Sequence, residues 1–354
     1  MGLFSRKTEL PRYFSACNFM PGPEGYGAAG LDARVRVVWQ RAMTARGHAL
    51  EISPDGALCA IIERKPGAAI TFCRSRDGAL LNRIAAPKGR SFDGHAVFNR
   101  AGTLLYATES RDGDQAGSIA VFNVADGTRV ATFPTHGIEP HELIWAEPDR
   151  SLAIGNGGIR DKLAMEAEIE SSLVLLDARD GTRLAKHVLD EDQISLSIRH
   201  LARSVDGGIV FVMQDQDAAT DWRPMAGLLT HSGAIEFLDL PLDDLMRLRG
   251  YCGSAAIDRS GTIAAASSPH GGLAAFWHVP DRRYLGSVEL RDGCGIAAGE
   301  TNGSFVFTSG SGTRIGVAAS PQGVASTVLE RPANHLPQWD NHLTASSRAP
   351  DRRD

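Results

Sequence analysis

Five of the eleven histidines in this chain occupy one position of a repeated sequence pattern. They are His48, His95, His141, His200 and His342. Imidazole is a frequent metal ligand and, when neutral, it both donates and accepts a hydrogen bond. If the fold brings these histidines together, they could bind a metal ion or form hydrogen bonds with neighbouring polar side chains. A single histidine at this position could equally hold the local geometry of a strand.

Polar side chains recur at a second position of the pattern, seven residues after a turn glycine. Glu63, Glu109 and Gln214 occupy it, and Asn156 is the nearest polar equivalent in the third repeat. The two carboxylates are candidate metal ligands or partners that orient the imidazoles. Imidazole together with carboxylate suits iron, copper, zinc or manganese, and the sequence does not choose among these transition metals.

Four arginines lie close to the same two positions: Arg64, Arg160, Arg199 and Arg249. A guanidinium group binds carboxylate or phosphate through two parallel hydrogen bonds. Together with Asn156 and Gln214, these arginines are therefore candidates for binding an anionic ligand. The alternative is that they form ion pairs with Glu63, Glu109 and Glu139, and the sequence favours neither interpretation.

No catalytic residue can be assigned from the sequence. It contains no Gly-x-Ser-x-Gly, no phosphate-binding glycine loop and no His-Glu-x-x-His. The five cysteines are widely spaced, with no Cys-x-x-Cys, which predicts buried free thiols rather than a disulfide framework or a zinc site.

The elements that must position these side chains are short strands. Residues 91–137 contain four runs rich in β-branched and aromatic residues, separated by turns with Gly or Asp. Similar units follow along the chain, and the residues that open their first strands are 47, 46, 59, 54, 41 and 47 positions apart. Four strands in a period of about 40–50 residues are typical of a β-propeller. Inserts at 157–171 and 215–225 explain the two long intervals, and residues 161–172 are predicted to form a surface helix.

Counting the units predicts an all-β, seven-bladed β-propeller of the YVTN/WD40-like type, formed by one domain over residues 1–354. Six blades are expected at 45–88, 91–137, 138–193, 197–242, 250–291 and 292–332. The seventh combines residues 12–44 with an inner strand from 335–347, so that both termini close the ring. The start of a blade's first strand and the end of its second lie on one face. We therefore expect the histidines and the other polar residues at one mouth of the central channel.

Composition excludes several classes of protein. The formal net charge is -5 and the basic residues are scattered, so nucleic-acid binding is not expected. No apolar run is long enough to span a membrane, so no transmembrane segment is expected. Hydrophobic residues make up 43% and charged residues 22%, as in an ordinary globular protein. We expect this protein to be monomeric.

The ordered motifs GHAVF, HGIEPHEL, NGGIR, SIRHLA, RGYCGS, SPHGG, CGIAAG and WDNHL resemble an uncharacterised bacterial family, a domain of unknown function. The resemblance implies a propeller that is encoded beside imelysin-like iron-uptake proteins, which are its expected partners. It also implies export, often by a twin-arginine signal, and thus the periplasm. The start MGLFSRKTELPRYF shows no export signal, so the cytoplasm is the alternative. The family's His-containing insert after NGGIR is missing, since Arg160 runs straight into Asp161.

Three functions remain open at this point. The leading expectation is a non-catalytic binding protein, accessory to bacterial iron or other metal uptake, with a histidine-rich site at the channel mouth. The second is a metal-dependent hydrolase, lactonase or redox protein that uses the same mouth. The third is a scaffold for protein interactions without a small-molecule site.

Overall fold

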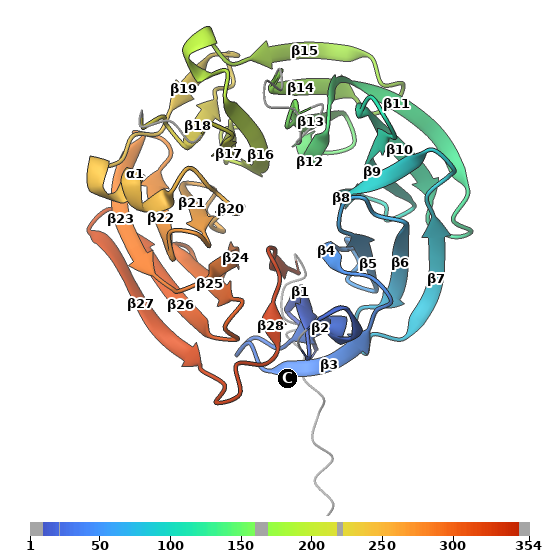
Figure 1. The fold of residues 1–354 in the computed structure, drawn as a ribbon, viewed down its shortest axis with the longest axis horizontal. Coiled ribbons are helices and arrows are strands. Elements are labelled where there is room, and N and C mark those ends of the chain that lie inside the picture. Colours follow the sequence, from blue (N-terminus) through green and yellow to red (C-terminus); the bar gives the residue numbers. More distant parts are fainter. Residues whose placement is uncertain (1–9, 21, 160–168, 218–221, 347–354) are drawn as a thin grey trace, which may run out of the picture.

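Seven antiparallel sheets are arranged around a common axis (Figure 1). This computed structural model describes residues 10–20, 22–159, 169–217 and 222–346. In each sheet the strands follow one another from the axis to the rim. The prediction of an all-β, seven-bladed propeller is confirmed.

Six blades are continuous in sequence, and each contains four strands. The strands nearest the axis are β4 (Gly47–Ile52), β8 (Arg90–Phe98), β12 (Pro140–Glu147), β16 (Leu196–Arg203), β20 (Ser254–Ile257) and β24 (Gly293–Ala298). The second strands are β5 (Leu58–Glu63), β9 (Leu104–Arg111), β13 (Ser151–Asn156), β17 (Ile209–Asp215), β21 (Ile263–Ser268) and β25 (Ser304–Ser309). The third are β6 (Ala69–Arg74), β10 (Ala116–Asn123), β14 (Ser172–Asp177), β18 (Ala226–Leu229), β22 (Leu273–His278) and β26 (Arg314–Ser320). The outer strands are β7 (Leu80–Ala85), β11 (Arg129–Ile138), β15 (Arg183–Val188), β19 (Ile235–Phe237), β23 (Arg283–Glu289) and β27 (Gly323–Glu330).

The seventh blade joins the two ends of the chain, as predicted. Its outer strands are β1 (Tyr13–Asn18), β2 (Tyr26–Leu31) and β3 (Val37–Ala42), and β28 (Gln338–Trp339) and β29 (Thr344–Ala345) both pair with β1. An ion pair of 2.5 Å between Arg46 and Asp340 joins this closing strand to the first blade. Closure by both ends of the chain completes the ring, so that the closing blade packs against the first and the sixth blade.

The turns show why the strands begin where they do. After β8, the Asn99 side chain accepts hydrogen bonds from the backbone N–H groups of Thr103 and Leu104. Gly102 in the same turn has φ of 69°, a conformation that glycine adopts without steric cost. The side chain and the glycine together reverse the chain and start β9.

The hydrophobic core lies between neighbouring blades. Phe72 of the first blade packs against Phe98 of the second, and Tyr106 of the second against Trp145 of the third, with ring centroids 6.5 and 5.3 Å apart. Comparable clusters continue around the ring to the closing blade. Each blade therefore buries its faces only against its neighbours, which couples the stability of all the blades.

Among the described residues, helical structure is limited to short connections: α1 (Leu242–Leu248) and the 3-10 turns η1 (Pro23–Gly25) and η2 (Glu191–Gln193). Most of the surface helix expected at 161–172 lies outside the described residues. Its last part is not helical, because Ile169 forms a β-bridge with Ile159 and β14 starts at Ser172. In the described part of the chain no helix has the length and apolar character needed to cross a membrane.

Candidate metal centre

Irregularities in the innermost strands aim the histidines toward the axis. The pairing register of the inner strand shifts at or next to the histidine in β4, β8, β12 and β16. In the closing blade, His342 lies in the gap between β28 and β29. A bulge inserts an unpaired residue and turns its side chain out of the normal alternation. The bulge in four blades, and the break between β28 and β29 in the closing blade, thus free the histidines from the regular alternation of the strand.

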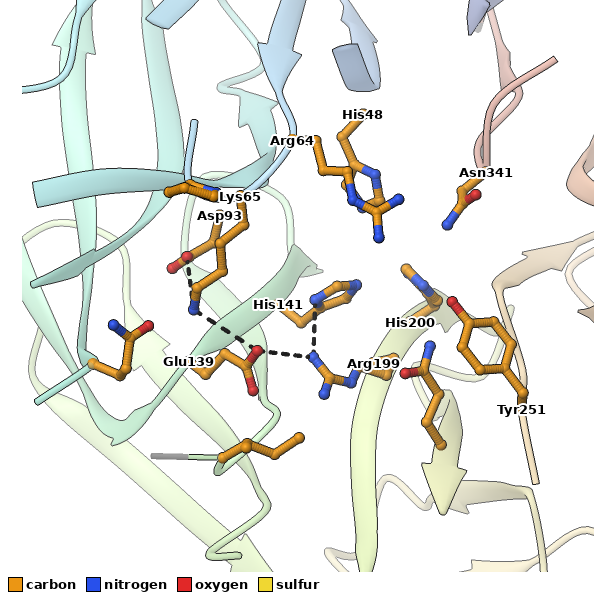
Figure 2. Close-up of a pocket in the computed structure, with 14 residues that line it drawn as sticks. His48, Arg64, Lys65, Asp93, Glu139, His141, Arg199, His200, Tyr251 and Asn341 are labelled. Carbon is orange, nitrogen blue, oxygen red and sulfur yellow. Dashed lines mark hydrogen bonds and ion pairs between the residues drawn. The ribbon is translucent and has the colours of Figure 1, made fainter. Parts of the chain in front are cut away.

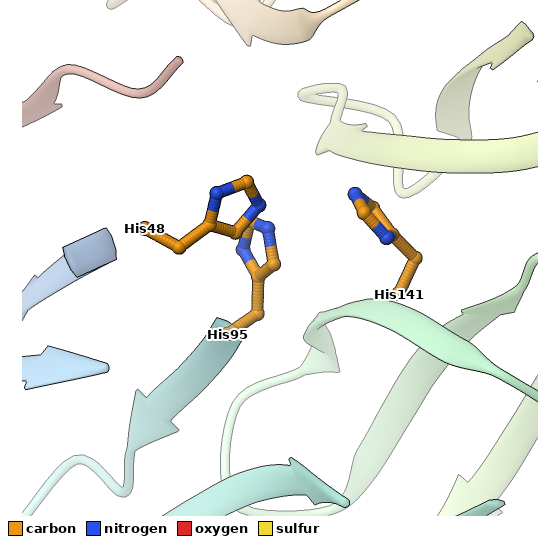
Figure 3. Close-up of side chains that lie close together, drawn as sticks. All are labelled: His48, His95 and His141. Carbon is orange, nitrogen blue, oxygen red and sulfur yellow. The ribbon is translucent and has the colours of Figure 1, made fainter. Parts of the chain in front are cut away.

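The structure brings all five predicted histidines together, and we call them the histidine cluster. Neighbouring imidazole centroids are 4.5 to 5.7 Å apart. His342 is central, with centroid distances of 4.5 Å to His48, 4.7 Å to His95 and 4.5 Å to His200. Figure 3 shows the imidazoles of His48, His95 and His141 facing a common space. Sequence spacing alone was sufficient to predict this convergence.

Glu142 fixes the orientation of two imidazoles. One carboxylate oxygen lies 3.4 Å from Nδ1 of His95, and the other lies 3.1 Å from Nδ1 of His200. An ionised carboxylate only accepts hydrogen bonds, so both Nδ1 atoms carry a proton. With its proton on Nδ1, a neutral imidazole at either position offers the lone pair of Nε2 to a metal ion. Nε2 of His95 is buried and has no hydrogen-bond partner in the described structure.

His342 and His48 meet through their Nε2 atoms, which are 3.2 Å apart. Nitrogens that bind one metal at about 2.0–2.1 Å lie about 3.3 Å apart in tetrahedral geometry, so the observed separation suits two ligands of one ion. The hydroxyl of Ser254, which takes the histidine position in the fifth blade, lies 3.3 Å from Nδ1 of His342. This contact can hold His342 with Nε2 toward the cluster.

In the part of the chain that the structure describes, two groups of three histidines could hold a metal ion, each with one nitrogen per residue within 4.8 Å of the others: His48, His95 and His141, or His95, His200 and His342. Nδ1 of His141 lies 3.4 Å from Nη1 of Arg199, and a guanidinium can only donate. Neutral His141 therefore carries its proton on Nε2, which cannot then act as a ligand. The second group, with His48 beside it, is the better candidate.

Burial favours the neutral form of four imidazoles in the cluster. The pKa values of His48, His141 and His342 lie well below the ordinary value, mainly because of burial and then of neighbouring positive groups. Burial also lowers the pKa of His200, although Glu142 acts in the opposite direction. Burial opposes ionisation of Glu142, but His95 and His200 outweigh it and lower the pKa of this carboxyl. Further along β4, burial and the Glu142 charge raise the pKa of Glu51 to about 8. Neutral imidazoles are the form that binds metal.

A cavity of about 370 Å³ adjoins the cluster and is bordered by His48, His141 and His200. Its polar wall includes Arg64, Lys65, Asp93, Glu139, Arg199 and Tyr251 (Figure 2). A chain of contacts runs along that wall: Lys65 lies 3.1 Å from Asp93 and 3.8 Å from Glu139, and Arg199 lies 3.3 Å from Glu139. Figure 2 shows this chain ending at His141.

The predicted carboxylates lie elsewhere. Glu63 accepts hydrogen bonds from Arg83 and the backbone of Ala68, and Glu109 pairs with Arg90 and Arg129. Within the described residues neither is hydrogen-bonded to the histidine cluster. Each carboxylate binds an arginine of the outer strand of its own blade. The position at the end of the second strand therefore predicted the face of the ring correctly, but it did not predict the direction of the side chain.

The predicted ligand-binding residues divide into two groups. Arg64, Arg199 and Gln214 line the cavity. Asn156 is buried behind it, where its amide donates to Thr135 and Ser172. Arg249 is exposed after α1 and is not among the residues that line the cavity. Arg160 lies outside the described residues.

Sequence reasoning missed Glu142, although a signal was present. The residue after the repeat histidine is apolar in four blades, as in Ala49, Ala96, Leu201 and Leu343, and acidic only in the third. An acidic residue at an otherwise apolar inner position indicates a partner for the imidazoles. Asp93 and Tyr251, which also line the cavity, carried no comparable signal.

Comparisons with known proteins identify the fold and a family. A family model described as "Protein of unknown function (DUF1513)" matches residues 41–346. A search of the curated proteins found no match. Among solved structures, a chain of hydrazine synthase from Kuenenia stuttgartiensis superposes with a TM-score of 0.64 at 15% identity, over 94% of this chain and 99% of that chain. A chain of the mitotic checkpoint complex superposes with a TM-score of 0.58 at 13% identity, over 93% of this chain and 84% of that chain. BamB from Moraxella catarrhalis superposes with a TM-score of 0.54 at 12% identity, over 94% of this chain and 87% of BamB. At such identities the likeness establishes the propeller fold alone.

Proposed function

This chain belongs to the family of proteins of unknown function DUF1513, and we propose that it is a β-propeller that binds a divalent transition-metal ion. The ligands are Nε2 of His95, His200 and His342, with His48 as the fourth. The observation that carries the proposal is the carboxylate of Glu142, shared between Nδ1 of His95 and Nδ1 of His200. Histidines that bind metal almost always donate their other N–H to such a group, which fixes the tautomer and strengthens the ligand.

Burial and charge support the same proposal. The described cluster contains several imidazoles in contact, and they would repel one another if protonated. A buried nitrogen without a partner, as on His95, costs about 1–3 kcal/mol unless something satisfies it. A metal ion would satisfy these nitrogens together, whereas hydrogen bonds within the cluster leave His95 unsatisfied.

The role that we propose is binding rather than catalysis, in the context of iron uptake in the periplasm. Imidazole ligands suit Fe²⁺ as well as Zn²⁺, Cu²⁺ and Ni²⁺, so the geometry supports metal binding in general. The specific link to iron and to imelysin-like partners rests on the family resemblance.

A second candidate function is metal-assisted hydrolysis. The cavity beside the cluster supports it, because a substrate there would lie next to the proposed ion. The two functions differ in one result: a hydrolase with metal bound would turn over esters or lactones, whereas a binding protein would not.

Metal titration tests the proposal. Apoprotein prepared with a chelator should bind one equivalent of Zn²⁺, Fe²⁺ or Co²⁺, and the double variant His95→Gln/His200→Gln should lose that binding and keep its fold. His231, which is exposed between β18 and β19, provides the matched control His231→Gln. A wild-type protein that binds no metal above the level of the double variant would contradict the proposal.

A further inference from the structure

We propose that the cavity beside the histidine cluster binds a small carboxylate-bearing chelator, with one carboxylate on the metal ion and a second on Arg64. The metal would then be held as an anionic complex rather than as a bare cation. This inference rests on the proposed function and adds the class of ligand that completes the site.

Arg64 is the first observation. It lines the cavity, and its guanidinium has no hydrogen-bond or ion-pair partner in the described part of the chain. Figure 2 shows it pointing into the cavity on the side of His48 and Asn341. The side chain is exposed to solvent at the cavity, so its positive charge is accessible to a carboxylate that enters there.

The charges along the wall are the second observation. Three cationic residues line the cavity, Arg64, Lys65 and Arg199, against two acidic residues, Asp93 and Glu139. Both acids are already bound, because Asp93 contacts Lys65 and Glu139 contacts Lys65 and Arg199. One positive charge is therefore left over, on Arg64, and a divalent ion in the cluster would add to it. A cavity with this excess favours an anionic ligand.

Arg199 is the third observation. Its side chain is 3% exposed, yet its Nε has no hydrogen-bond partner in the described structure. A buried guanidinium nitrogen without an acceptor is unfavourable, and a ligand oxygen in the adjoining cavity would satisfy it. The amide of Gln214 and the phenol of Tyr251 border the same space and can donate to further oxygens.

The arrangement favours a ligand with two separate oxygen groups. Arg64 would bind one carboxylate through two hydrogen bonds, and an ion held by the four imidazoles would take an oxygen of the other carboxylate as a fifth ligand. A single small anion could occupy only one of these places. The volume of about 370 Å³ falls in the range of small-molecule sites and accommodates a di- or tricarboxylate.

Binding of malonate to the Co²⁺-loaded protein tests the inference. Co²⁺ reports its coordination through its visible absorption, so malonate should change the spectrum of the wild-type protein at saturation. The variant Arg64→Gln should bind malonate about 10–100-fold more weakly, as expected for losing a charged hydrogen-bonding pair, while its Co²⁺ affinity is retained. Arg249→Gln, an exposed arginine that does not line the cavity, is the matched control and should behave like wild type.

The possible failures are distinguishable. If Co²⁺ binds but malonate does not, or if Arg64→Gln binds malonate as well as wild type, the inference is wrong and the metal site stands. If inorganic phosphate changes the spectrum and malonate does not, the carboxylate class is wrong. If Co²⁺ itself does not bind, the proposed function fails, and malonate binding to the metal-free protein would then refute the co-ligand role as well.

Discussion

Acid should destabilise the metal-free protein more steeply than an ordinary propeller, because the buried histidines stay neutral. The pKa values of His48, His141, His200 and His342 are all lowered in the folded state. Below the ordinary pKa of about 6.5, the unfolded chain therefore takes up protons that the folded chain does not. By linkage, the free energy of unfolding must fall as the pH falls through this range.

The magnitude follows from a proton count at pH 6. Four unfolded histidines hold about three protons there, and each of the four holds fewer in the folded state, so about three protons is the upper bound of this difference. Two carboxyl groups reduce this difference in bound protons, because they hold protons in the folded state. Glu51, with its pKa raised to about 8, keeps about one proton in the folded state, and Asp93, raised to about 6 mainly by burial, keeps about half. The net difference is then at most about 1.5 protons, which corresponds to a loss of up to about 2 kcal/mol for each pH unit.

Urea unfolding at pH 7.0, 6.5, 6.0 and 5.5, in the presence of a chelator, measures this slope. In the double variant His48→Gln/His342→Gln, the unfolded chain takes up about 1.5 fewer protons at pH 6. The free energy of unfolding of this variant should therefore change little with pH near pH 6. The exposed control His231→Gln should keep the wild-type slope. A wild-type stability that is flat or rises on acidification would refute the assignment of neutral, buried imidazoles.

Three further predictions concern single elements of the site and the ring. Replacing Glu142 with Gln should weaken Zn²⁺ binding about 10–100-fold in a chelator competition, whereas Glu147→Gln at the exposed end of β12 should leave it unchanged. If the Glu142→Gln variant and the wild-type protein bind Zn²⁺ equally well, Glu142 does not support the metal ligands. Gly94→Ala places Cβ 2.4 Å from the His48 imidazole, so it should lower both metal affinity and melting temperature more than Gly89→Ala, which has positive φ but nothing within 4 Å. Removing residues 336–354 deletes the inner strand of the closing blade and should lower the melting temperature of the whole domain; a wild-type melting curve would argue against closure by both termini.

The architecture was predictable from the sequence because it depends on periodicity. Turn residues and short apolar strands recur at nearly constant intervals, and a four-stranded unit that cannot bury its faces alone requires a ring of copies. The histidines open the first strands, and those strands line the axis, so their convergence followed from the same count. The shared seventh blade followed from the strands left over at the two ends.

The details of the site were not predictable because they depend on bulges and side-chain direction. A register shift of one residue changes the face to which a side chain points, and no sequence pattern specified the shift between Pro140 and Glu142. Glu142 therefore reaches His95 and His200, while Glu63 and Glu109 turn toward outer-strand arginines. The pairing of Arg199 with Glu139 likewise depends on β12 and β16 approaching each other.

X-ray absorption at the metal edge tests the central claim most directly. Protein loaded with one equivalent of Zn²⁺ should give a first shell of three or four nitrogens at about 2.0–2.1 Å, with the outer-shell scattering of imidazole. The same spectrum recorded for His95→Gln/His200→Gln should lose that imidazole signal. A wild-type spectrum with an oxygen-only shell, like that of the hydrated ion, would contradict the account and leave the histidine cluster as a structural element of the channel.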